Sequence, residues 1–270
     1  MKNIFSILIL VVFLLKGLIS VAQCSVPASF VVNADSITTT SATLSWELNP
    51  NLIGYRLALI PNNSDETVTL SSFSNLPAGT ITNFVLDGAS SFSPNNLQPS
   101  TRYFAFIQPI CENWIYGEIF PLQGNKFETK PINDFCSAAV SINFTTGTSV
   151  TAQSVNDAST FGASQSDVTE TGSVVDCFPN INDIWYSFTA TNSVHCIVLT
   201  KGILHDPELN DTAISMFSGG CNNLQLISCQ QGSNVKFTNL VVGTTYFLRV
   251  AKSGMIKFLS YPFAFLIKSV

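Results

Sequence analysis

Leu97-Gln-Pro-Ser-Thr-Arg-Tyr103 places a leucine, a proline turn, a threonine and a tyrosine directly before an alternating segment. This order predicts the corner of an antiparallel β-sandwich, in which the ring of Tyr103 is buried and its hydroxyl bonds back to the turn, a tyrosine corner. Leu240-Val-Val-Gly-Thr-Thr-Tyr246 repeats Leu, Thr and Tyr at the same spacing. Two corners predict an all-β fold with two antiparallel β-sandwich domains in series.

Residues 1–22 have the pattern of a signal peptide rather than of a folded segment. An early lysine precedes the apolar run Ile4–Leu15, and Ser20-Val-Ala22 offers a small-residue cleavage site. The alternatives are an N-terminal membrane anchor and a lipoprotein acylated on Cys24, which Gln23 disfavours. The sequence therefore predicts a secreted, extracellular or cell-surface protein with no transmembrane segment after cleavage.

The charge balance excludes one class of partner. The chain has 12 basic and 17 acidic residues, a formal net charge of −5, and cleavage would remove two of the lysines. Without a basic patch there are few counterions to release, so nucleic acid and anionic lipid are not expected partners. About 248 residues would remain, which suits two domains that each bury a core.

Seven cysteines in an exported chain favour disulfides over metal or redox chemistry. Spacing alone leaves the pairing open. One arrangement keeps every bridge within one domain and leaves Cys196 unpaired: Cys24–Cys111, Cys136–Cys177 and Cys221–Cys229.

A first domain is expected over residues 23–130. Inward positions alternate in several segments: Ala42, Leu44, Trp46 and Leu48, then Tyr55, Leu57 and Leu59, then Tyr103, Ala105 and Ile107. Ser41–Trp46, Tyr55, the first corner and Phe127–Lys130 follow the strand order of a fibronectin type III domain, and this half resembles that family. The segments 61–92 and 111–126 are longer than the corresponding stretches of that family.

The first long segment has a physical purpose in either of two interpretations. Phe104 and Phe106 point outward from a strand that starts at Tyr103, and apolar patches of this kind are normally covered or used. In one interpretation Val68, Leu70 and Phe73 fold back over them. In the other, the patch contacts the second domain or a partner.

A short linker is expected at 131–134 and a second domain at 135–270, with short strands and polar turns typical of a sandwich or jelly roll. Asp183–Phe188, Phe217–Cys221 and Gly243–Val250 carry a resemblance to bacterial pre-peptidase C-terminal domains, which are found on secreted proteins of gliding and biofilm (Bacteroidetes-type) bacteria. That resemblance implies an accessory module that attaches or presents rather than one that catalyses.

No catalytic motif is present, and the sequence predicts a protein that is not an enzyme. It lacks Gly-x-Ser-x-Gly, His-Glu-x-x-His and a phosphate-binding glycine loop. We expect His195 to be an exposed strand residue and Cys196 a buried thiol on the opposite face. No cofactor is expected, with calcium as the alternative, because Asp206, Glu208 and Asp211 crowd one loop.

Cys111-Glu-Asn-Trp-Ile-Tyr-Gly117 is the candidate ligand-binding loop. Loops at the ends of a sandwich are frequent binding sites, and aromatic faces stack on sugars and form protein interfaces. Trp114 and Tyr116 supply rings, while Glu112 and Asn113 supply hydrogen-bonding groups. The alternative is that Trp114 packs onto the edge of the corner.

The sequence thus predicts a non-catalytic binding or adhesion protein whose partner is an extracellular glycan or a surface protein. Two other functions stay open. The chain could be the accessory, substrate-binding portion of a secreted peptidase or glycosidase, or it could be a structural spacer between other modules.

Overall fold

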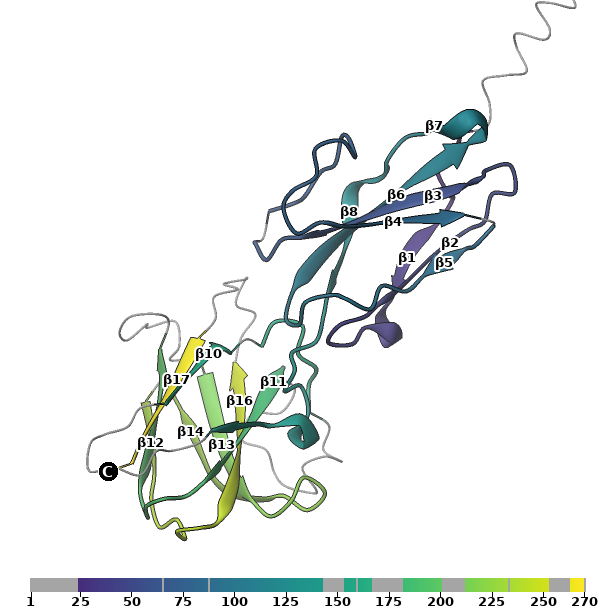
Figure 1. Cartoon of the computed structure of the whole chain (residues 1–270). Helices are drawn as coiled ribbons and strands as arrows, with labels where there is room; N and C mark the ends of the chain where they lie inside the picture. Colours follow the sequence, from purple (N-terminus) through teal and green to yellow (C-terminus); the bar gives the residue numbers. More distant parts are fainter. Residues whose placement is uncertain are drawn as a thin grey trace, which may run out of the picture.

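The computed structural model describes residues 24–64, 66–86, 88–142, 153–158, 160–166, 182–200, 212–232, 234–252 and 263–269. Two bodies lie end to end, one formed by the first half of the chain and the other by the second half (Figure 1). Every strand pairing among the described residues stays within one half. The protein is all-β with sandwich architecture, as predicted. The boundaries of the two domains remain a proposal.

The first half forms two facing sheets. One has the order β1-β2-β5, with β1 (Phe30–Asn33), β2 (Thr43–Trp46) and β5 (Ser91–Phe92). The other has the order β4-β3-β6-β7, with β4 (Ile81–Leu86), β3 (Gly54–Pro61), β6 (Arg102–Cys111) and β7 (Ile115–Tyr116). A further strand, β8 (Phe120–Glu128), also pairs with β6. Much of the segment 111–126 is therefore strand, where the sequence analysis treated it as a lengthened loop.

Alternation along these strands builds the core of the first half. Trp46 meets Tyr55 edge to face, with ring centroids 5.3 Å apart, an arrangement that aromatic quadrupoles favour. The buried members are Phe30, Ala42, Leu44, Trp46, Tyr55, Leu57, Leu59, Leu97, Tyr103, Ala105, Ile107 and Phe127. Leu48, expected inward, lies beyond the end of β2 and is exposed.

Both tyrosine corners are present. The Tyr103 hydroxyl accepts a hydrogen bond from the backbone N–H of Gln98 at 2.8 Å. The Tyr246 hydroxyl accepts one from the backbone N–H of Val241 at 2.9 Å. Both rings are buried, so each corner satisfies the hydroxyl while it buries the apolar ring.

The long segment after β3 covers the outer face of its sheet. Ala58, Ile60, Phe104 and Phe106 are buried there beneath Leu70, with Val68, Phe73, Leu76 and Ile119 packed against them. The sequence left two interpretations open, and the structure has the one in which the segment folds back over the sheet. The phenylalanines of β6 are thereby shielded from water.

The second half forms a five-stranded and a four-stranded sheet. The first has the order β14-β13-β16-β11-β9, with β14 (Gln225–Gln231), β13 (Thr212–Ser218), β16 (Thr245–Lys252), β11 (Asp183–Thr189) and β9 (Val140–Ile142). The second has the order β10-β17-β12-β15, with β10 (Gln153–Ala158), β17 (Phe263–Ser269), β12 (His195–Thr200) and β15 (Asn234–Phe237). Pairing is antiparallel except between β9 and β11.

The inward and outward sides of strand β12 are the reverse of those predicted. His195 and Ile197 are buried, whereas Cys196 is half-buried. Nε2 of His195 accepts hydrogen bonds from the backbone N–H groups of Thr191 and Asn192, at 3.2 and 3.3 Å. Because these bonds satisfy the nitrogen, the ring can lie inside, edge-on to Phe188 at 5.3 Å. The expectation of an exposed His195 and a buried Cys196 was wrong.

The disulfides also correct the sequence analysis. Cys24 is bonded to Cys111, but Cys136 is bonded to Cys221. Cys229 is disulfide-bonded as well, and Cys196 is a free thiol. The pairings Cys136–Cys177 and Cys221–Cys229 were wrong because the turn after β13 lies next to the short helix η3 (Cys136–Ala138), which sequence distance does not reveal. Cys177 lies outside the described residues.

The segment 131–134, predicted as a short linker, is hydrogen-bonded to the second half. The backbone N–H of Trp185 donates to the Asn133 carbonyl at 2.9 Å, and the Asn133 side chain donates to the Trp185 carbonyl at 2.8 Å. Lys130 forms an ion pair with the buried Asp134 at 3.5 Å. Asn133 is therefore tied to β11 by one backbone and one side-chain hydrogen bond.

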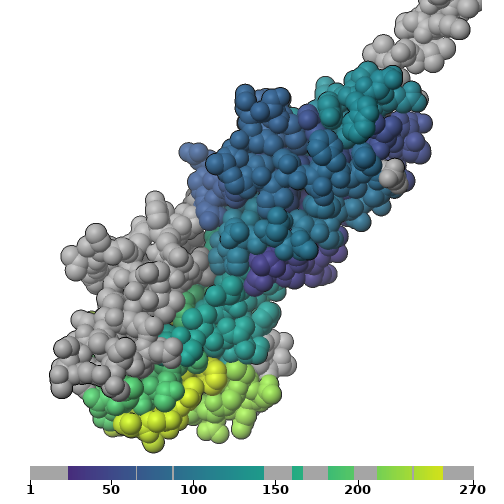
Figure 2. Space-filling view, in the orientation of Figure 1, coloured from purple at the N-terminus to yellow at the C-terminus, as the bar shows by residue number. Residues whose placement is uncertain are grey.

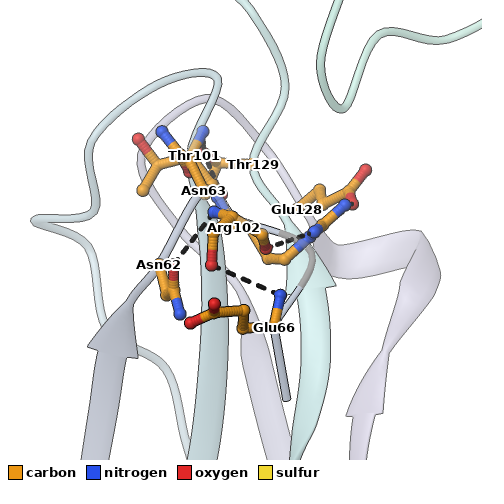
Figure 3. Close-up of polar contacts among 8 residues, drawn as sticks. Asn62, Asn63, Glu66, Thr101, Arg102, Glu128 and Thr129 are labelled. Carbon is orange, nitrogen blue, oxygen red and sulfur yellow. Dashed lines mark hydrogen bonds and ion pairs between the residues drawn. The ribbon is translucent and has the colours of Figure 1, made fainter. Parts of the chain in front are cut away.

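Residues from both halves meet around Arg102, whose polar contacts Figure 3 shows. Arg102 is buried, donates to Glu128 through Nε and Nη2, and donates to the Ser64 carbonyl through Nη1. Phe161, from the second half, lies over its guanidinium, 4.7 Å from ring centroid to Cζ. Gly162 has φ +69°, and a Cβ there would come within 2.2 Å of the Thr129 carbonyl oxygen. The contact thus depends on a glycine.

Candidate functional site

The candidate loop lies at the end of the first half that is remote from the second half, where β7 is drawn in Figure 1 and teal atoms form the tip in Figure 2. It is a tight hairpin: β6 ends at Cys111, the short helix η2 (Glu112–Trp114) turns the chain, and β7 returns along β6. The structure brings Glu112, Asn113, Trp114 and Tyr116 together on this one hairpin.

The hairpin is held at its base. The Cys24–Cys111 disulfide fixes its first residue, and the backbone N–H of Gly117 donates to the Pro109 carbonyl at 3.0 Å. A Cβ at Gly117 would lie 2.6 Å from the Cys24 carbonyl oxygen, so only glycine permits this close approach. The loop is therefore anchored at both of its ends.

Trp114 projects from this hairpin. Its side chain is 56 % exposed, and neighbouring Ile115 is 60 % exposed. The alternative that Trp114 packs onto the edge of the corner was wrong. Asn113 and Trp114 both have φ +58°, a left-handed conformation that is uncommon for a bulky residue. Such conformations cost free energy and cluster at ligand-binding sites.

Tyr116 has a partner that the sequence analysis missed. The Arg56 guanidinium lies over its ring at 3.9 Å and over the ring of Phe73 at 4.3 Å. Nε of Arg56 donates to Oε1 of Gln108 at 2.6 Å, and the Gln108 side chain donates to the Gly117 carbonyl. Burial lowers the pKa of Arg56, and Tyr116 partly offsets that effect. The pKa of an arginine starts far above neutrality, so Arg56 keeps its charge.

Arg56 could have been recognised only in part. Its outward position follows from inward Tyr55 and Leu57 on either side. Its neighbours Phe73 and Tyr116 are far away in sequence, and the cross-strand register that brings them close is a property of the folded sheet.

The other predicted sites stay untested. Asp206, Glu208 and Asp211 lie outside the described residues. Within the part of the chain that is described, no three His, Cys, Asp or Glu side chains are grouped closely enough to hold a metal ion. The same residues contain no helix that is long and apolar enough to cross a membrane.

Asp183 is a structural residue rather than a ligand. It is buried and pairs with Arg249, at 2.8 Å from Nε and 2.7 Å from Nη2. Ser166 donates to it from both its backbone and its hydroxyl, and also accepts from the Trp185 indole at 2.8 Å. These contacts account for the carboxylate within the core of the second half.

Several solved structures share similarity with the chain. The fn3 domain of human collagen alpha-1(XX) chain is 19% identical, covers 41% of this chain and 89% of its own, and has a TM-score of 0.31. The FN5 domain of Drosophila Lar is 18% identical, with 38% and 94% covered and a TM-score of 0.28. The two-domain fibronectin type-III segment of chicken tenascin is 15% identical, with 90% and 99% covered and a TM-score of 0.31.

No curated protein shows significant similarity to the chain. A family model matches the second half alone. Residues 132–261 are similar to the T9SS-associated family described as galactose binding domain-like. The resemblance to pre-peptidase C-terminal domains stays a prediction.

Proposed function

We propose that this protein is an exported, non-catalytic binding module that recognises extracellular glycans through the hairpin Glu112–Gly117. The observation that carries the proposal is Trp114, an indole 56 % exposed on a hairpin that a disulfide and a glycine contact hold in place. A fixed aromatic face binds a sugar ring at low entropic cost. Glu112 and Asn113 lie beside it as hydrogen-bonding groups for hydroxyls.

Two further observations support export and carbohydrate recognition. Disulfides persist in oxidising compartments, which agrees with the signal-peptide pattern of residues 1–22. The family matched by residues 132–261 is galactose binding domain-like and T9SS-associated. A secreted protein that carries such a module beside an exposed aromatic hairpin is suited to attachment at a cell surface.

The test is binding of the secreted protein to an array of neutral and acidic oligosaccharides, followed by calorimetric titration of the best glycan. Trp114→Ala should weaken that affinity about thirtyfold, the usual loss for an aromatic that dominates an interface. Leu122→Ala is the matched control, since Leu122 is 76 % exposed and lies outside the hairpin.

The melting temperature of each variant is followed beside the affinity. Unchanged binding by Trp114→Ala would place recognition elsewhere. A melting temperature that falls in step with the affinity would make Trp114 a structural residue. Absence of binding to every glycan on the array would overturn the proposed function.

A further inference from the structure

Arg56 lies on the outer face of the β4-β3-β6-β7 sheet, opposite Phe84 on β4 and Gln108 on β6. The segment after β3 covers the adjacent part of this face, over Ala58 and Phe106, and its Phe73 lies against Arg56. Beyond it, Phe84 is 54 % exposed and Leu86 is 39 % exposed. Arg56 thus lies between the exposed apolar side chains of β4 and the amide of Gln108.

The guanidinium is held in one orientation. Phe73 and Tyr116 contact it through their ring faces, and Gln108 accepts the hydrogen bond from its Nε. Gln108 is itself buried and fixed by its bond to the Gly117 carbonyl, at the base of the Trp114 hairpin. A guanidinium that lies flat against aromatic rings presents its remaining N–H groups at its edge.

Arg56 differs from two other arginines in how its charge is balanced. Among the residues that the structure describes, Arg102 and Arg249 each pair with a carboxylate, whereas no carboxylate lies within ion-pair distance of Arg56. Partial burial works against the charge and lowers the pKa of Arg56. A charge that is oriented, partly desolvated and lacking a carboxylate is the half of an ion pair that a ligand can complete.

We propose that Arg56 binds the carboxylate of an acidic sugar, so that the hairpin and the adjoining sheet face together recognise a uronic acid-containing glycan. This inference rests on the proposed function and specifies its ligand class. The two-pronged edge of a guanidinium can form two parallel hydrogen bonds with a planar carboxylate. The exposed ring of Trp114 offers a face on which the C–H side of a sugar ring can stack.

The experiment uses one pair of probes that differ only by methyl esterification of their carboxylates: tetragalacturonate and its fully methyl-esterified form. The parent protein should bind the acid at least about tenfold more tightly than the ester, the usual worth of a charge-assisted hydrogen bond. Arg56→Gln should remove that preference. Arg56→Lys keeps the charge without the fork and should retain only part of it.

Lys236→Gln is the matched control, because it removes one charge from an exposed position of the second half and should leave both affinities unchanged. Equal affinity of the parent for acid and ester would overturn the inference. Binding of a hexaglutamate peptide without binding of tetragalacturonate would overturn it too.

The proposed function would survive either result if a neutral glycan still bound in a Trp114-dependent way. The comparison of acid with ester needs only the parent protein, so it holds even if Arg56→Gln loosens the stack with Phe73 and Tyr116.

Discussion

The corner of the first sandwich and the corner of the second are the same structure in different surroundings. In each, a tyrosine hydroxyl accepts from a backbone N–H five residues earlier. The first corner is hydrogen-bonded to Thr129, which lies at the junction between the halves. Thr129 donates to the Gln98 carbonyl at 2.6 Å and accepts from the Thr101 N–H at 3.0 Å. At the second corner, Val241 and Val242 are largely exposed.

The interiors of the two halves differ as well. Arg102 is buried, but its partner Glu128 is 29% exposed and can reach water. Arg249 and Asp183 are both fully buried. The ion pair of the first half thus lies at an edge, beside the second half. The ion pair of the second half lies inside its core. The comparison teaches that the corner is a local device and that the stability of each half depends on what surrounds it.

The largest expected effect concerns the enclosed ion pair. Arg249→Met leaves the Asp183 carboxylate buried without its counter-charge and should cost the second half about 3–5 kcal/mol of unfolding free energy. Arg102→Met should cost less because Glu128 can turn to solvent. Chemical denaturation followed by tryptophan fluorescence measures both. The double variant Asp183→Leu/Arg249→Met should recover part of the loss, and equal losses for the two arginines would contradict the comparison.

The next effect concerns the junction. Gly162→Ala places a Cβ against the Thr129 carbonyl and forces alanine into a left-handed conformation, so we expect a loss of about 2 kcal/mol. Gly88→Ala is the control, since Gly88 has φ +73° with nothing within 4 Å, and should lose only about 1 kcal/mol. Calorimetric scans measure both. Equal losses would mean that the contact between the halves carries no free energy.

Loss of the tyrosine hydroxyl at either corner should lower the unfolding free energy by a smaller amount, equal in the two halves. Tyr103→Phe and Tyr246→Phe each keep the ring and lose the hydroxyl's hydrogen bond, at a cost of about 1 kcal/mol. Each loss should appear in the transition of its own half, as resolved by differential scanning calorimetry. If either variant shifted both transitions equally, the halves would unfold as one unit rather than independently.

The smallest effect is a pH dependence specific to the second half. Burial lowers the pKa of His195 below 6.5, so below that pH the unfolded chain binds a proton that the folded one resists. The stability that neutral His195 contributes is therefore complete above pH 6.5 and falls as the pH falls. Subtracting the profile of His195→Gln from that of the parent isolates this contribution. A difference that does not vary with pH would contradict the assignment.

Local patterns predicted what is local in this fold. A tyrosine corner is closed within one turn, so Leu97–Tyr103 and Leu240–Tyr246 contain all the information that the corner needs. The alternation of Tyr55, Leu57 and Leu59 likewise identified the inward face of β3. The covering of Phe104 and Phe106 was foreseen as one of two outcomes, because the sequence showed an exposed apolar pair and a long apolar segment beside it.

Two of the errors concern partners that are distant in sequence, and one concerns a local contact. Cys136 bonds to Cys221 across 85 residues, a pairing that depends on where the turn after β13 lies in space. The facing of β12 was mispredicted because Cys196 was placed on the inward face, yet His195 lies inside, where two nearby backbone N–H groups satisfy it. Arg56 was missed because its stack with Tyr116 arises from sheet register.

Strand β6 has a mechanical consequence. Its 10 residues run from Arg102, at the junction with the second half, to Cys111, at the base of the exposed hairpin. At about 3.3 Å per residue, this single strand spans the first half. A tether that is pulled at the hairpin and held at the second half would load β6 along its axis. Its ladders to β3 and β8 would then resist in shear, many hydrogen bonds at once, rather than peel open one by one.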